Sequence, residues 1–149
     1  MREQHAMSCG IILRDRKLLL MRRNELGVWG IPCGGVEFGE SPEETVVREM
    51  KEETGLDVAP KEILCMLSLR FKDDLTKMEK HLIGPAYVCE TGSYEIKMNE
   101  ENTDYKWVSF EEAMKIGFNE VKGTDGKYSH LAHGTDTVLK ELKKRNLID

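Results

Sequence analysis

The stretch that decides the fold runs from residue 34 to residue 56 and reads GGVEFGESPEETVVREMKEETGL. Its central part carries the usual start and stop signals of a helix. Ser41 is a favoured N-cap residue, Pro42 suits the first helical position, and Glu44 completes a capping box with Ser41. Gly55 is a typical helix stop. The sequence therefore predicts a helix of about thirteen residues between Ser41 and Gly55.

Three acidic residues share one face of this helix. Glu49, Glu52 and Glu53 are spaced i, i+3 and i+4, whereas Val46 and Met50 fall on another face at about 100° per residue. The carboxylates repel one another by about 0.2–0.5 kcal/mol per adjacent pair, and a hard divalent cation would turn that repulsion into attraction. Taken alone, however, such a triplet is more often an ordinary solvated surface.

The residues before the helix favour the metal-binding alternative. Residues 27–40 read GVWGIPCGGVEFGE, and so many glycines predict backbone that bends tightly or approaches another group closely. This segment delivers Glu40 to the start of the helix. Backbone groups of the loop, including the carbonyl near Cys33, would complete a cation shell over the acidic face.

The spacing of these residues resembles the Nudix box, the sequence signature of the Nudix hydrolase family. Seven fixed letters match, and chance would give such a match on the order of one in ten million times per starting position. The matching positions are Gly34, Glu40, Arg48, Glu49, Glu52, Glu53 and Gly55. Residues 29–32 and 107–109 also resemble the family's usual surroundings, so the resemblance spans most of the chain.

The resemblance implies an α+β fold of the Nudix type, an α/β/α sandwich around a mixed sheet. It also implies hydrolysis of a nucleoside diphosphate linked to another group, with Mg²⁺ or Mn²⁺ as the cofactor. Glu49, Glu52 and Glu53 would be metal ligands and catalytic groups, with Glu49 or Glu53 activating the attacking water. Arg48 would orient Glu49 or Glu52, and Glu40 would contribute to the outer metal shell.

Further site residues are expected outside the acidic face. One more acidic ligand is expected from the loop beyond the box, where Glu101 is our choice and Glu100 and Asp104 are the alternatives. Cys33 stands where the family usually has a glycine. Its backbone is expected near the metal, and its side chain is expected to be a small buried thiol. The groups expected to contact substrate are Arg23, Gly34 and Gly35.

The rest of the chain predicts a mixture of hairpins and helices, which also favours an α+β fold. Residues 7–23 read as a hairpin that turns at Asp15 and Arg16, and residues 63–71, 81–89 and 105–108 read as strands. Ser109 begins a second capping box, and residues 135–145 have the apolar spacing of a helix.

Composition limits the protein's class and partners. The 149 residues carry a net charge of −5, are 40% hydrophobic, and predict one domain over residues 1–149. No apolar run is long enough for a membrane span or signal peptide, so a cytoplasmic protein is expected. The acidic balance argues against nucleic acid as a partner. The four cysteines form no Cys-x-x-Cys pair and are expected to be reduced.

The substrate is expected to be a small nucleotide. A nucleoside triphosphate is the first choice, which would make the protein a house-cleaning pyrophosphohydrolase, and ADP-ribose or a nucleotide sugar comes second. Residues 69–75 lack the downstream Pro or Tyr that marks ADP-ribose and diadenosine specificity in the family. A non-catalytic nucleotide-binding domain is the alternative, but its expected mark is a lost carboxylate, and this box has lost none. A homodimer is left open.

Overall fold

The computed structural model describes residues 1–23, 27–73, 76–117, 131–132 and 134–149. The strands within these residues are β1 (Arg2–Ile11), β2 (Leu13–Arg14), β3 (Lys17–Arg23), β4 (Trp29–Gly30), β5 (Cys33–Gly35), β6 (Val58–Lys72), β7 (Glu79–Thr91) and β8 (Asn102–Val108). The helices are α1 (Pro42–Thr54), α2 (Phe110–Ile116) and α3 (Thr135–Lys144). None of these helices is long and apolar enough to cross a membrane.

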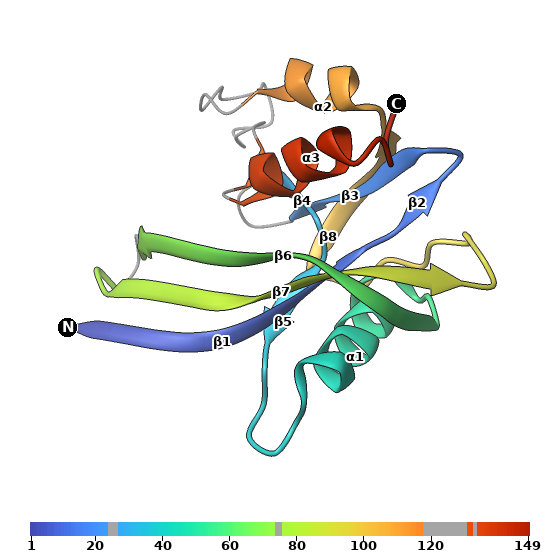
Figure 1. The fold of residues 1–149 in the computed structure, drawn as a ribbon. Coiled ribbons are helices and arrows are strands. Elements are labelled where there is room, and N and C mark those ends of the chain that lie inside the picture. Colours follow the sequence, from blue (N-terminus) through green and yellow to red (C-terminus); the bar gives the residue numbers. More distant parts are fainter. Residues whose placement is uncertain (24–26, 74–75, 118–130, 133) are drawn as a thin grey trace.

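The strands form two sheets between layers of helices. One sheet has the order β5-β1-β7-β6, and in the other β3 lies between β4 and β8 and also pairs with β2. Strands β1 and β7 run parallel while β5 and β6 pair antiparallel with their neighbours, so the first sheet is mixed. Figure 1 shows α1 on one side of the strands and α2 and α3 on the other. The expected α+β fold of Nudix type is confirmed.

Strand β3 explains why both sides of the strands need covering. Its sequence KLLLMRR contains a continuous apolar run, and successive side chains of a strand point to opposite faces. Leu18 and Leu20 belong to the core cluster that includes Leu139 of α3, whereas Leu19 and Met21 belong to the cluster that includes Met50 of α1. These side chains are almost completely buried. The sequence of β3 therefore requires a helix layer on each side.

Several predicted elements are confirmed with small changes in their bounds. The hairpin turns at Asp15 and Arg16, which both have positive φ, and α1 covers the predicted residues. Strands β6 and β7 are longer than the predicted 63–71 and 81–89, because their ladder continues through polar residues from Val58–Thr91 to Lys72–Glu79. Polar residues at the strand ends concealed this continuation in the sequence.

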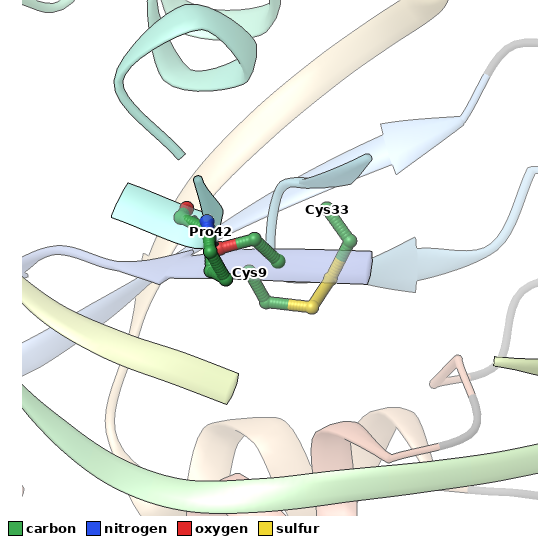
Figure 2. Close-up of a disulfide and its surroundings, with 4 residues drawn as sticks. Cys9, Cys33 and Pro42 are labelled. Carbon is green, nitrogen blue, oxygen red and sulfur yellow. Dashed lines mark hydrogen bonds between the residues drawn. A yellow bond between two sulfur atoms is a disulfide. The ribbon is translucent and has the colours of Figure 1, made fainter. Parts of the chain in front are cut away.

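The prediction that all four cysteines are reduced is wrong for two of them. Cys9 of β1 and Cys33 of β5 form a disulfide (Figure 2), and Cys65 and Cys89 are free. The two bonded residues face each other directly in the antiparallel ladder, with their Cα atoms 4.1 Å apart. The Gly10 N–H donates to the Pro32 carbonyl and the Val36 N–H donates to the Ala6 carbonyl, which marks the hydrogen-bonded pairs of this ladder. By alternation the Cys9–Cys33 pair is a non-hydrogen-bonded one, where side chains approach most closely. A sequence separation of 24 residues concealed the contact.

The disulfide predicts a stability that depends on the redox state. It closes a loop with a sequence separation of 24 residues, for which the loss of chain entropy in the unfolded state is worth about 3 kcal/mol. A dithiol reductant should lower the free energy of unfolding by about that amount in guanidinium titrations. The double variant Cys9→Ala/Cys33→Ala should give the same curve with and without reductant. A wild-type unfolding curve that is the same with and without reductant would contradict the Cys9–Cys33 disulfide.

Candidate active site

Helix α1 is fixed at both ends, which sets the direction of its acidic face. The Ser41 hydroxyl accepts a hydrogen bond from the Glu44 N–H at 3.1 Å, and the Glu44 carboxylate accepts one from the Ser41 N–H at 3.4 Å. Gly55 ends the helix in the left-handed conformation, with φ of 76°. Val46 and Met50 are fully packed on the opposite face. The helix therefore cannot rotate without losing core contacts.

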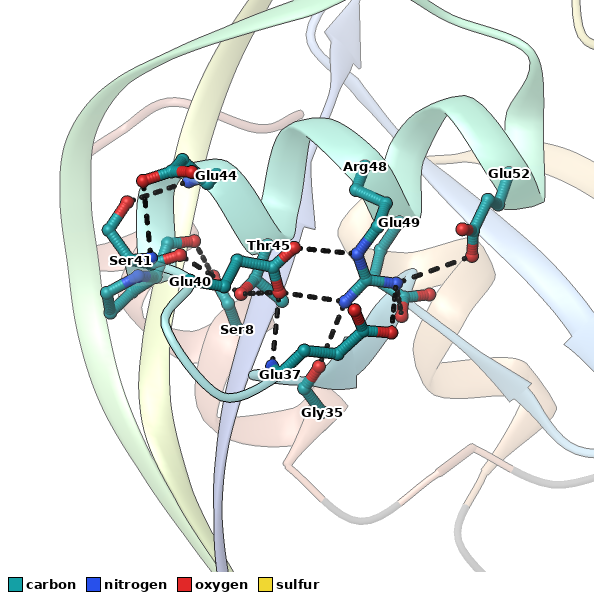
Figure 3. Close-up of polar contacts among 11 residues, drawn as sticks. Ser8, Gly35, Glu37, Glu40, Ser41, Glu44, Thr45, Arg48, Glu49 and Glu52 are labelled. Carbon is teal, nitrogen blue, oxygen red and sulfur yellow. Dashed lines mark hydrogen bonds and ion pairs between the residues drawn. The ribbon is translucent and has the colours of Figure 1, made fainter.

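Arg48 is the centre of a polar network beside the acidic face (Figure 3). Its guanidinium donates two hydrogen bonds to Glu40, at 2.8 and 2.9 Å, and one to Glu49 at 2.8 Å. It also donates to the Gly35 carbonyl at 3.1 Å and lies 3.5 Å from a carboxylate oxygen of Glu52. One arginine thus joins the loop before α1 to two of the three predicted metal ligands.

Glu40 is held by this network on every side. Besides Arg48, it accepts hydrogen bonds from the Thr45 hydroxyl at 2.6 Å and from the Glu37 N–H at 3.2 Å. The hydrogen bonds from Arg48 and Thr45 lower the pKa of Glu40 to about 2. Both of its oxygens are therefore engaged in fixing Arg48, which in turn holds Glu49.

Gly34 and Glu49 lie in immediate contact. A Cβ atom built on Gly34 would overlap the carboxyl group of Glu49, whereas one built on Gly35 would meet nothing within 4 Å. Strand β5 therefore passes so close to α1 that a side chain at position 34 would require the Glu49 side chain to move. The two neighbouring glycines have different roles: Gly34 makes room for a carboxylate, and Gly35 offers its carbonyl to Arg48.

Glu53 is the most deeply buried member of the acidic face. Its residue is 3% exposed, and its Oε2 has no hydrogen-bond partner among the described residues. Burial raises the pKa of Glu53 to about 8; the positive charge of Arg23 opposes this increase, and the charges of Glu49 and Glu101 add to it. Burial also raises the pKa of Glu49. The site thus holds a buried carboxylate, Glu53, whose second oxygen has no hydrogen-bond partner among the described residues.

The structure brings several of the predicted site residues near one another, although not close enough to share an ion as they stand. Glu101 and Arg23 lie close enough to affect the charge state of Glu53, so both approach the acidic face. By contrast, Asp104 turns one carboxylate oxygen to the Tyr105 N–H at 2.8 Å. Cys33 is next to Gly34, but its sulfur is bonded to Cys9, so its backbone alone is left for a ligand.

The oxygen donors fit a hard divalent cation in chemistry, although they do not converge as they stand. Among the described residues no three acidic, histidine or cysteine side chains are grouped closely enough to hold an ion. Glu49 is directed to Arg48 at 2.8 Å instead. The unpaired buried oxygen of Glu53 and the raised pKa values of Glu49 and Glu53 are what a cation would relieve. Binding would require Glu49 or Glu52 to turn from Arg48.

Sequence reasoning missed two side chains that belong to this region. Thr45 supports Glu40 through its hydroxyl, and Asn102 is buried at the start of β8, opposite Arg23. The spacing of Glu40 and Thr45 across the start of a helix could have indicated the first contact. Nothing in the sequence distinguished Asn102, because strand pairing alone brings it next to Arg23.

Comparisons with known proteins agree with the fold and the site. The NUDIX domain family model matches residues 4–129. The ADP-ribose pyrophosphatase of Methanocaldococcus jannaschii is 33% identical over 76% of this chain and 66% of its own length. The nucleoside triphosphatase NudI of Escherichia coli is 33% identical over 78% of this chain and 89% of its own. The crystal structure of the MutT protein from Methanosarcina mazei superposes with a TM-score of 0.75, at 25% identity, covering 97% of this chain and 96% of that one.

The layered fold, the complete box and these matches define a Nudix hydrolase. The chain belongs to the NUDIX family, whose model covers most of its length.

The raised pKa of Glu53 predicts that stability without metal falls as pH rises. Between the ordinary value of 4.5 and about 8, the folded protein keeps a proton that the unfolded chain releases. With a chelator present, the wild-type Tm should therefore fall between pH 5 and pH 8 relative to Glu53→Gln, which has no carboxylate to ionise. A relative fall of about 4 °C or more is expected, since 1 kcal/mol corresponds to roughly 2–4 °C in a protein of this size. Parallel Tm curves for the two proteins would show that Glu53 is not buried in this way.

The contact between Gly34 and Glu49 predicts a difference between two neighbouring glycines. Gly34→Ala should displace the Glu49 carboxylate and lower kcat by about 100-fold, because a shift of about 1 Å in a catalytic group has effects of that size. Gly35→Ala is the matched comparison: its Cβ meets no protein atom, so Glu49 stays in place and kcat should remain within a few-fold of wild type, whereas contact of Gly35 with the substrate would change KM instead. Circular dichroism checks that both variants fold. Equal losses in the two variants would refute the specific role of Gly34.

Proposed function

We propose that this chain is a metal-dependent pyrophosphohydrolase that attacks a P–O–P linkage with water. The observation that carries the proposal is the acidic face of α1, where Glu53 buries an unpaired carboxylate oxygen beside Glu49 and within electrostatic reach of Glu101. Burying like charges together costs stability unless a cation joins them. A diphosphate brings negative charge of its own, so an acidic site suits it only when a divalent cation lies between the two.

Each residue has a separate role in this proposal. Glu49, Glu52 and Glu53 would hold Mg²⁺ or Mn²⁺, with Glu101 as the further acidic ligand and the backbone near Cys33 completing the shell. When bound, the cation neutralises charge on the phosphoryl oxygens and lowers the pKa of a water molecule.

Proton transfer and orientation belong to the protein. Glu53 is the first candidate to accept the proton of the attacking water, since its Oε2 is a carboxylate oxygen that no hydrogen bond occupies among the described residues. Glu49 is the second candidate. Arg48 keeps Glu49 in place through the hydrogen bond at 2.8 Å. Arg23 brings a positive charge to the edge of the site, where it would contact the phosphates, and the backbone of Gly34 and Gly35 would lie against the substrate.

A nucleoside triphosphate is our first choice of substrate. The support is the likeness to the nucleoside triphosphatase NudI of Escherichia coli, which extends over 89% of that protein's length. ADP-ribose comes second, supported by the archaeal relative, with nucleotide sugars beside it. The net charge of −5 supports a small nucleotide rather than nucleic acid as the partner. A cytoplasmic location, a single domain over residues 1–149 and a homodimer stay predictions.

A nucleotide-binding domain without turnover is the competing function. It predicts that a substrate panel gives binding and no products. All the carboxylates of the box are present, which favours an enzyme.

The substrate class is tested by a panel of compounds with Mg²⁺, read by product chromatography. The panel contains nucleoside triphosphates, nucleotide sugars, ADP-ribose and dinucleoside polyphosphates. We expect a nucleoside monophosphate and pyrophosphate from the best triphosphate. Release of orthophosphate alone from every compound would contradict the proposed bond, and binding without any product would favour the non-catalytic alternative.

Metal binding is tested separately by thermal denaturation. Saturating Mg²⁺ or Mn²⁺ should raise Tm, because a ligand that binds only the folded protein stabilises it; at 100 times the Kd the gain is about 2.7 kcal/mol. Glu53→Gln and Glu52→Gln should reduce this increase by at least about half. Glu62→Gln removes an exposed carboxylate on β6 and should leave it unchanged. An unchanged Tm in the wild type would mean that the acidic face only interacts with solvent.

A further inference from the structure

Asn102 is a buried polar residue that the proposed chemistry has not yet used. It is the first residue of β8 and is 6% exposed. Its side-chain nitrogen donates to the Asn99 side-chain oxygen at 3.5 Å, and its backbone N–H donates to the Asn99 carbonyl at 3.4 Å. Its own oxygen, Oδ1, has no partner. Among the described residues, Asn102 Oδ1 and Glu53 Oε2 are the two buried side-chain atoms in this condition.

Strand pairing directs Asn102 to the side of the sheet that carries α1. Residues directly opposite each other in an antiparallel pair project to the same face, and Asn102 lies opposite Arg23 of β3. Leu19 and Met21, four and two residues before Arg23, pack in the cluster with Met50 of α1. By alternation Arg23 faces the same way, and so does Asn102.

A shift in register makes this placement possible. The pairing of β3 with β8 moves from Arg22–Asp104 to Arg23–Asn102, which leaves Thr103 as an extra residue. If the register continued without this shift, Thr103 would lie opposite Arg23, and Asn102 would lie beyond the paired residues. The irregularity therefore brings an amide next to an arginine whose charge reaches Glu53.

The neighbours of Asn102 belong to the acidic site. Glu101 precedes it in the chain, and its charge acts on both Glu49 and Glu53. A buried acceptor without a partner costs about 1–3 kcal/mol. An ionised carboxylate and an amide oxygen are both acceptors and cannot satisfy each other, so the partner that each of them lacks is a cation or a proton donor. Mg²⁺ usually keeps several of its waters in proteins, and these are such donors.

We propose that Asn102 is a positioning residue of the cation site, whose amide oxygen accepts a hydrogen bond from a water molecule on the ion held by Glu53. This inference rests on the proposed function. The Asn99 contact fixes the amide by its nitrogen, so the oxygen keeps one direction. Mutation of a residue that hydrogen-bonds to a ligand of a metal ion usually lowers the affinity for that ion by 10–100-fold.

The test measures Mn²⁺ binding by calorimetry on the full chain without substrate, together with Tm in chelator. Asn102→Ala should weaken Mn²⁺ binding at least about tenfold, and Asn102→Asp, which keeps an acceptor oxygen, should bind at least as tightly as the wild type. Thr103→Ala is the matched control: it truncates the exposed neighbouring side chain and leaves the Asn102 amide in place. It should keep Mn²⁺ affinity within about twofold of the wild type, and Tm in chelator checks that each variant folds.

The outcomes separate this inference from the proposed function. Wild-type affinity in Asn102→Ala, or an equal loss in Thr103→Ala, would mean that the Asn102 amide has no specific role at the ion, and would overturn the inference while the enzyme proposal stands. A wild-type protein that binds no Mn²⁺ and hydrolyses nothing in the panel would overturn both.

Discussion

The site depends on one ion-pair network, in which Arg48 holds several carboxylates at once. Its guanidinium takes both oxygens of Glu40, one oxygen of Glu49 and the carbonyl of Gly35. A planar fork with several donors can do this, whereas the single ammonium of a lysine cannot. Because Arg48 and Glu49 are neighbours on α1 and Glu40 precedes the helix, the network fixes the loop and the acidic face together. Glu53 lies outside this network, and its charge is left for another partner.

The core and the site constrain each other through α1. Val46 and Met50 pack against the side of β3 that carries Leu19 and Met21, and this packing leaves Glu49 directed toward Gly34 of β5. Catalytic side chains that lie on a packed helix are held more rigidly than side chains on a loop. Glu101 and Asn102 come from the edge of β8 instead, so the site joins a rigid helix to a strand end.

Local sequence patterns predicted the parts of this site that depend on nearby residues. The capping box and the Gly55 stop follow from spacing within α1, and both are confirmed. The contacts between β1 and β5 and between β3 and β8 join residues far apart in the chain. The Cys9–Cys33 bond was therefore predicted wrongly, and Asn102 was missed. The overlap that excludes a side chain at Gly34 follows from how closely β5 approaches α1, a distance that spacing along the chain does not contain.

The cross-link between Cys9 and Cys33 also guards against misalignment of two strands. Strand β5 is only three residues long, and a slip of one residue would move its side chains to the other face. Such a slip would place Cys33 opposite Ser8 or Gly10, so that no disulfide could form. It would also place a residue other than Gly34 next to Glu49. The disulfide can therefore form only in the alignment in which the Glu49 carboxylate has space, so oxidation of the two thiols would stabilise the native register over the shifted ones.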